Sequence, residues 1–372
     1  SLLRSPGSRC WSLRTMTAVE GRRFQLREVG VELFFNSPRG SFLFSVDEPA
    51  ARTQLARLLH ARAGGPVSER PLLLTAQERA EAMLQPLMAR WLARDLTNFE
   101  YLMELNWMAG RTYNDLAQYP VMPWVLADYT SERIALDDAG AYRDLSLPMG
   151  AQLPARRAYF TGRFRDACEI HAEMAAMARG ADEATQLFMA PPPWHFGTHY
   201  SNPQVVLWYL VRLEPFTSLH IFLQDGRFDR PDRQFHSVRG AFDGCTTCDG
   251  DVKELVPEFF YFPEFLRNSA GFRLGTTQRK VALDDVVLPP WANGSAEHFV
   301  RVNRAALESD IVSARLHQWV DLIFGFRQRG PAAEEACNVF YHVTYEGAVD
   351  LEGMRTRNPD LYHKVLSMVD NY

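Results

Sequence analysis

Residues 98–124 read NFEYLMELNWMAGRTYNDLAQYPVMPW, and this stretch indicates how the larger part of the chain folds. Its first half places polar side chains among large apolar ones, and its second half carries Pro120 and Pro123 between aromatic residues. Because proline can neither continue a helix nor donate to an interior ladder, much of this domain is predicted to pack in irregular extended segments. Such segments satisfy their backbone groups with buried polar side chains.

Prolines next to aromatic residues occur again at residues 190–194 and 288–291, so the irregular core is predicted to extend well beyond the first stretch. Apolar periodicity and capping residues between these segments predict helices. The predicted helices are residues 75–96, 165–188 with a break at Gly180, 201–215, 302–324 and 331–345.

The N-terminal residues have a different pattern, which favours strands followed by one helix. Residues 30–35 and 41–46 are short β-type runs joined by a turn, and this predicts a hairpin. A helix is predicted from Asp47 to Gly64, with one apolar face made by three leucines. These are Leu55, Leu58 and Leu59. Two strands and a helix cannot enclose a core alone, so we expect them to be part of a larger module.

Composition limits the function classes. The chain has 372 residues, of which 47% are hydrophobic and 23% charged, as in ordinary globular proteins. A net charge of −5 disfavours nucleic-acid binding. The five scattered cysteines favour a reducing compartment over a disulfide framework, and no apolar run is long enough to cross a bilayer.

One pattern supports an enzymatic alternative, a zinc-dependent hydrolase or deaminase. His171 and Glu173 form an H-x-E motif, and Cys245 and Cys248 form a C-x-x-C motif, which together are the residue types of zinc nucleobase deaminases. However, Gly244 stands where that signature has proline, and the two motifs are far apart in the sequence. Phosphate-loop, dinucleotide and nucleophile-elbow motifs are absent. We therefore predict no catalytic residues, cofactor or metal.

Twelve segments of the sequence resemble a BEACH domain, specifically that of the neurobeachin and neurobeachin-like group. They are residues 98–102, 109–116, 118–124, 143–146, 196–201, 211–217, 251–261, 287–292, 316–319, 321–326, 328–331 and 344–347. Residues 11–63 resemble the second half of the PH-like domain that precedes BEACH in this family. The resemblance implies a partial PH-like domain at 1–65, a linker at 66–75 and a BEACH domain at 76–372. The expected fold class is α+β, with truncated PH-like strands and a helix before a mainly α BEACH domain with irregular core segments.

The resemblance also implies a function. Family members are large cytoplasmic scaffolds without catalytic activity, peripherally associated with endomembranes and usually carrying a WD-repeat propeller after BEACH. They act in vesicle trafficking, in granule or lysosome-related organelle biogenesis and in membrane protein targeting. We therefore expect protein partners in membrane traffic, bound through the PH–BEACH unit, and an intramolecular PH–BEACH contact.

The candidate partner-binding residues lie in the opening stretch, where arginine and aromatic side chains suit a desolvated contact. They are Arg111, Tyr113, Asn114, Asp115, Tyr119 and Trp124. Strong phosphoinositide binding is not expected, because the arginines of the N-terminal region alternate with glutamates. The arginines are Arg22, Arg23 and Arg39, and the glutamates are Glu20, Glu28 and Glu32.

Overall fold

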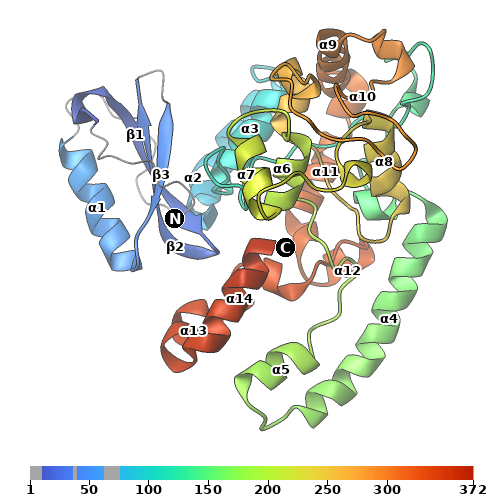
Figure 1. Ribbon diagram of the computed structural model, residues 1–372. Helices are drawn as coiled ribbons and strands as arrows, with labels where there is room; N and C mark the ends of the chain where they lie inside the picture. The colour runs from blue at the N-terminus through green and yellow to red at the C-terminus, as the bar shows by residue number, and fades with distance from the viewer. Residues whose placement is uncertain (1–10, 37–39, 63–75, 372) are drawn as a thin grey trace. The chain divides into compact units, whose positions relative to one another are not determined.

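The structure is a computed structural model that describes residues 11–36, 40–62 and 76–371 (Figure 1). The chain divides into two compact units, Ser1–Pro86 and Leu87–Tyr372. The predicted linker at 66–75 lies outside the described residues. The division falls inside helix α2 (Ala76–Leu92), and the predicted start of the second domain at residue 76 stays a prediction.

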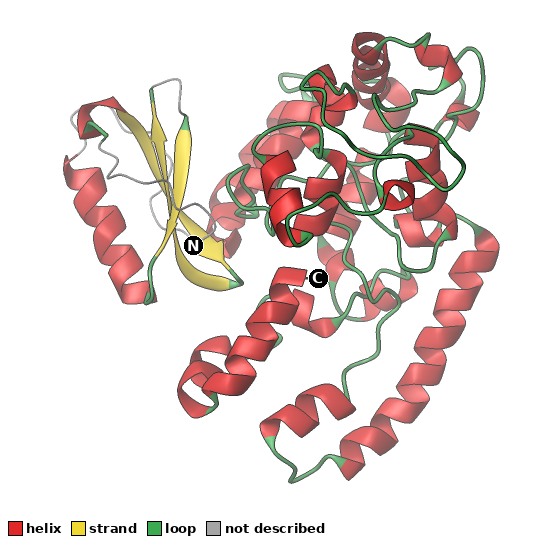
Figure 2. Ribbon diagram, in the orientation of Figure 1, coloured by secondary structure: helices red, strands yellow, loops and turns green. Residues whose placement is uncertain are grey.

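The first unit contains a three-stranded antiparallel sheet and one helix (Figure 2). The strands are β1 (Met16–Phe24), β2 (Arg27–Phe35) and β3 (Ser41–Ser45), in the spatial order β1-β2-β3, and helix α1 (Pro49–Arg62) follows. Val31 on the central strand pairs with Gly21 on one side and Phe44 on the other. The predicted hairpin and helix are confirmed. The sequence analysis missed β1, because the charged residues Glu20 and Arg22 interrupt its apolar pattern.

The core of the first unit lies between one face of the sheet and α1. It consists of Met16, Val19, Val31, Leu33, Phe35 and Ala56, with Trp11, Leu13, Phe42, Leu55 and Leu59 packed around them. Leu55, Ala56 and Leu59 occupy positions i, i+1 and i+4, which share one helix face. The prediction for Leu58 was wrong, because it points away from this face and is 49% exposed.

Charged side chains of the first unit pair with one another. Arg22 of β1 donates from Nε to Glu32 of β2 at 2.7 Å, and Arg52 of α1 pairs with Glu28. Arg22 is therefore neutralised by its own sheet, while Arg39 lies outside the described residues. This pairing removes one of the arginines that an anionic lipid headgroup would need.

The second unit is built from helices joined by long irregular segments (Figures 1 and 2). Beyond α2 the helices are α3 (Asn98–Met108), α4 (Pro154–Met177), α5 (Glu183–Met189), α6 (Pro203–Tyr209), α7 (Phe216–Leu223), α8 (Val238–Thr247), α9 (Ala296–Leu307), α10 (Asp310–Ser313), α11 (Leu316–Ile323), α12 (Pro331–Glu335), α13 (Leu351–Arg357) and α14 (Pro359–Asn371). The predicted α+β class, with a mainly helical second part, is confirmed. Among the described helices, none has both the length and the apolar composition that crossing a bilayer requires.

Three predicted helices are shorter or interrupted in the structure, because local caps begin and end them. The predicted helix at 201–215 is helical only over α6, Pro203–Tyr209. The predicted helix at 302–324 is three helices, α9, α10 and α11, since the Ser309 side chain accepts from the backbone N–H of Val312 and caps α10. The predicted helix at 331–345 ends at Glu335, shortly before Cys337 takes a positive φ of 55°. Apolar periodicity did not reveal these interruptions.

The predicted helix at 165–188 begins earlier than expected. Its first part belongs to α4, which starts at Pro154 with proline in the first turn. The predicted break is confirmed at Gly180, whose φ of 79° favours glycine, and α5 follows it.

Gly150 and Gly162 provide a matched test of the packing of the second unit. A Cβ atom on Gly150 would lie 2.2 Å from Cε1 of Phe196 and 2.9 Å from Cγ1 of Val252, whereas a Cβ atom on Gly162 would meet no atom of the described residues within 4 Å. We expect Gly150→Ala to lower the free energy of unfolding by ~1–3 kcal/mol through overpacking. Gly162→Ala, inside α4, should raise it by ~0.5–1 kcal/mol. Urea unfolding measures both, and equal midpoints for the two variants would contradict the packing described.

Candidate partner-binding site

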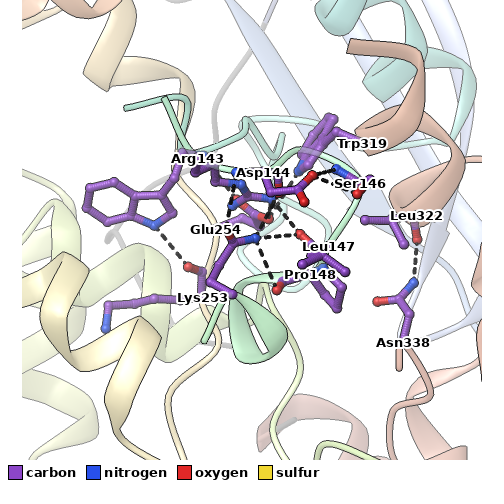
Figure 3. Close-up of polar contacts among 12 residues, drawn as sticks. Arg143, Asp144, Ser146, Leu147, Pro148, Lys253, Glu254, Trp319, Leu322 and Asn338 are labelled. Atoms are coloured by element: carbon purple, nitrogen blue, oxygen red, sulfur yellow. Dashed lines mark hydrogen bonds and ion pairs between the residues drawn. The ribbon is translucent and has the colours of Figure 1, made fainter. Parts of the chain in front are cut away.

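A buried carboxylate, that of Glu254, is the centre of the polar interior of the second unit (Figure 3). Its two oxygens accept from Arg143 at 3.0 and 2.9 Å. They also accept from the backbone N–H of Trp124 and from the indole Nε1 of Trp319, both at 3.0 Å. The side chains of Arg143 and Glu254 are 1% and 2% exposed, so the ion pair is removed from water.

Extended segments hold these groups in place. Met122 and Leu255 form an antiparallel bridge through N–H···O bonds of 2.8 and 2.9 Å. The Trp124 indole donates to the backbone carbonyl of Lys253 at 3.1 Å, and the backbone N–H of Arg143 donates to the backbone carbonyl of Val125 at 3.1 Å. The segment around Trp124 therefore lies between the segment that carries Glu254 and the segment that carries Arg143.

Short loops around the ion pair are also fixed by hydrogen bonds (Figure 3). The Asp144 carboxylate accepts from the backbone N–H and the hydroxyl of Ser146, and the Gln152 amide donates to the carbonyls of Asp144 and Leu147. Nearby, the Asn338 amide donates to the carbonyl of Leu322 at 2.9 Å. The arrangement anchors backbone, which is a structural role.

Arg143 and Glu254 lie within two of the family-like segments, 143–146 and 251–261, but neither is predicted from the sequence to be a structural centre. Glu254, with Lys253 before it, stands between Val252 and Leu255–Val256 and is buried with them. Because charged residues are almost never fully buried unless paired, such an interruption signals an ion pair. The pattern does not identify the partner.

Four of the six predicted partner-binding side chains are interior. They are Arg111, Asp115, Tyr119 and Trp124. Arg111, 9% exposed, donates to the Tyr119 carbonyl at 2.9 Å and to the Tyr200 hydroxyl at 3.2 Å. Trp124 is completely buried against Tyr129 and Phe259. An arginine beside aromatic residues indicates a buried contact as readily as a surface one, and here these side chains fill the interior.

Tyr113 and Asn114 are the exposed members of the predicted set. Tyr113 is 41% exposed and its ring packs edge-on against Tyr119, with centroids 5.3 Å apart. It also shares a side-chain hydrogen bond with Tyr261, and burial raises the pKa of both hydroxyls. The assignment of partner binding to this position stays a prediction.

Behind this surface, a second buried carboxylate has a perturbed pKa. The Tyr119 hydroxyl donates to Oε1 of Glu258 at 2.6 Å, while Oε2 of Glu258 is buried and has no hydrogen-bond partner among the described residues. Burial raises the pKa of Glu258 from 4.5 to about 7, because desolvation penalises the charged form. The sequence analysis missed Glu258 as a titrating residue.

The residues of the zinc alternative do not assemble. Among the described residues, no three or more His, Cys, Asp or Glu side chains lie close enough to share a metal ion. Cys245 is buried and its Sγ lies 3.6 Å from Oδ1 of Asp251, while Cys248 is exposed. Burial raises the pKa of the Cys245 thiol, which opposes the thiolate form that zinc requires.

The chain was compared with known proteins. Residues 89–371 match the family model described as Beige/BEACH domain. The chain is 46% identical over 344 residues to a putative neurobeachin homolog of Caenorhabditis briggsae and 45% identical to that of Caenorhabditis elegans. It is 43% identical over 372 residues to BEACH domain-containing protein B of Arabidopsis thaliana. These alignments cover 91%, 91% and 93% of the chain, but the chain spans only 13% of the length of each relative.

The buried ion pair generates a stability prediction. Glu254→Gln leaves the Arg143 charge buried without its counter-ion, and we expect a loss of ~3–5 kcal/mol in unfolding free energy. The matched control is Asp310→Asn, which breaks the exposed Arg94–Asp310 pair and should leave the urea midpoint unchanged. Equal midpoints for the two variants would show that Glu254 does not anchor the fold.

Glu258 generates a pH prediction. Between about pH 4.5 and pH 7 the folded protein binds a proton at Glu258 that the unfolded chain releases, so wild-type stability falls as pH rises through this window. Glu258→Gln keeps an acceptor for Tyr119 and removes the titration. Its stability relative to the wild type should therefore rise by roughly 3 kcal/mol from pH 4.5 to pH 7 and then level off. Urea unfolding across this range measures the difference. A difference between the two proteins that does not change with pH would contradict the titration.

Proposed function

The chain belongs to the BEACH domain family, and from this premise we propose that it is a non-catalytic scaffold module that binds protein partners in vesicle trafficking. The observation that carries the proposal is the family match over residues 89–371, together with 43–46% identity to neurobeachin homologs and a plant BEACH protein. The proposed setting is granule or lysosome-related organelle biogenesis and membrane protein targeting, with peripheral association with endomembranes.

The chemistry of the interior supports a scaffold. The Glu254 carboxylate accepts from Arg143, from the backbone N–H of Trp124 and from the indole N–H of Trp319, and Arg143 donates with two nitrogens to Glu254, so both charged groups are engaged within the protein. Catalytic groups need a reacting atom within reach in a cleft, whereas these groups are covered by protein. A scaffold instead requires a stable interior and a distinctive surface.

We also propose that the first unit is the second half of a PH-like domain. Three antiparallel strands followed by a helix that packs on one face of the sheet support this assignment. Arg22 is paired with Glu32 inside the sheet and is not available to a lipid headgroup, and we propose that membrane association depends on protein partners.

Partner capture tests the scaffold proposal. The full chain, fused to a proximity-labelling enzyme and expressed in cells, should enrich proteins of vesicle coats, sorting complexes or their cargo. The double variant Tyr113→Ala/Asn114→Ala should lower this enrichment several-fold, because both side chains are exposed and Tyr113 is an aromatic anchor.

The matched control is Tyr159→Ala, which removes an exposed tyrosine of α4. It should leave the enrichment and the melting temperature unchanged. A wild-type profile no different from that of the labelling enzyme alone would count against the scaffold function. An unchanged profile for the double variant would remove Tyr113 and Asn114 from the site.

A further inference from the structure

An open groove runs along α9 in the second unit and takes no part in the interior contacts described above. Its volume is about 540 Å³, within the range of ligand-binding clefts. One wall is the turn that contains Phe260, Tyr261 and Pro263, and the other wall is a face of α9. The lining residues from α9 and its C-terminal cap are Glu297, Val300, Arg301, Arg304, Ala305 and Glu308.

The aromatic wall of the groove is rigid. Tyr261 is 46% exposed, and its ring packs edge-on against Phe99 with centroids 6.0 Å apart. Its hydroxyl is hydrogen-bonded to Tyr113, the exposed residue already proposed for partner contact. An aromatic ring that is held in place while remaining accessible loses little conformational entropy on binding, and such residues are the usual anchors of protein interfaces.

The two carboxylates that line the groove already bond to other groups of this chain. Glu308 accepts from the backbone N–H groups of Asn98 and Phe99 at 2.7 and 3.1 Å, and from Nε of Arg304 at 2.9 Å. Glu297 pairs with Arg267. Their negative charge is therefore largely compensated.

Positive charge is less compensated. Arg301 is exposed, and its one hydrogen bond within the described chain goes to Nδ1 of His298 at 2.6 Å. A guanidinium has five N–H donors in a planar fork that matches a carboxylate, so most of its capacity remains open. Arg304 lies over the Phe99 ring, 4.1 Å from its centroid, and its charge is paired with Glu308, so Arg301 is the arginine of the groove that keeps open donors.

We propose that this groove docks a short segment of a partner protein in which a large apolar side chain stands next to an aspartate or glutamate. The apolar side chain packs between Tyr261 and Val300, and the carboxylate pairs with Arg301. This inference rests on the proposed scaffold function and assigns a surface to it. An anionic bilayer fits less well, because the carboxylates of Glu297 and Glu308 also line the groove.

Selection from a peptide library tests the groove. Random 12-residue peptides displayed on phage are selected on the full chain and counter-selected on the variant Arg301→Glu/Ala305→Trp, which reverses the charge and fills the groove. We expect enriched peptides to carry an aromatic or large aliphatic residue within two positions of Asp or Glu. By fluorescence polarisation, the enriched peptide should bind Arg301→Glu at least ~tenfold more weakly than the wild type.

Matched variants separate docking from folding. Arg279→Glu, at an exposed arginine that does not line the groove, should bind the peptide as the wild type does. Arg301→Lys should bind with intermediate affinity, because it keeps the charge and loses the fork. All variants should melt at the wild-type temperature, which shows that weaker binding is not caused by unfolding.

Four results would overturn the groove proposal. One is the absence of any peptide whose binding depends on Arg301, and another is an enriched motif that lacks a carboxylate. The third is Arg301-dependent flotation on phosphatidylserine vesicles, which would assign the surface to membranes. If Arg301→Glu retains the full proximity-labelling profile, the groove proposal fails while the scaffold function stands. If the wild type shows no specific labelling, the scaffold function fails independently of the peptide result.

Discussion

The buried ion pair between Arg143 and Glu254 organises the interior of the BEACH domain. Isolated buried charges are strongly unfavourable, so each must be paired and hydrogen-bonded when the chain folds. Glu254 meets this requirement with four donors from three separate segments, those of Arg143, Trp124 and Trp319. The pair thus specifies which irregular segments lie side by side, a role that strand ladders have in other folds.

The same logic explains why a proline-rich core is stable here. Segments without regular ladders need other partners for their backbone groups, and buried side chains supply them. Arg111 bonds the carbonyl of Tyr119, and Asn106 bonds the backbone of Val121 through both its amide and its oxygen. Polar residue types that often form binding sites on a protein surface are buried in this domain, where they form hydrogen bonds with backbone groups.

The surface has a different chemistry from the interior. Its distinctive groups are accessible aromatics held by neighbours, as Tyr261 is by Phe99 and Tyr113, and an arginine with open donors, Arg301. Glu258 lies behind this surface, and burial raises its pKa to about 7. The interior thus uses its polar groups to hold backbone, whereas these surface groups remain accessible.

The sequence by itself determined the family, the α+β class, the hairpin and helix of the first unit, and the irregular core, because these follow from local punctuation and from motifs. It also located the break at Gly180, where a positive φ favours glycine. Only the tertiary structure decided which polar residues are buried. Arg143 and Glu254 are 111 residues apart, and nothing local in either segment identifies the other as its partner. The residues that flank Arg111 and Trp124 in the sequence are compatible with an exposed position and with a buried one. Long-range packing alone places both side chains in the interior.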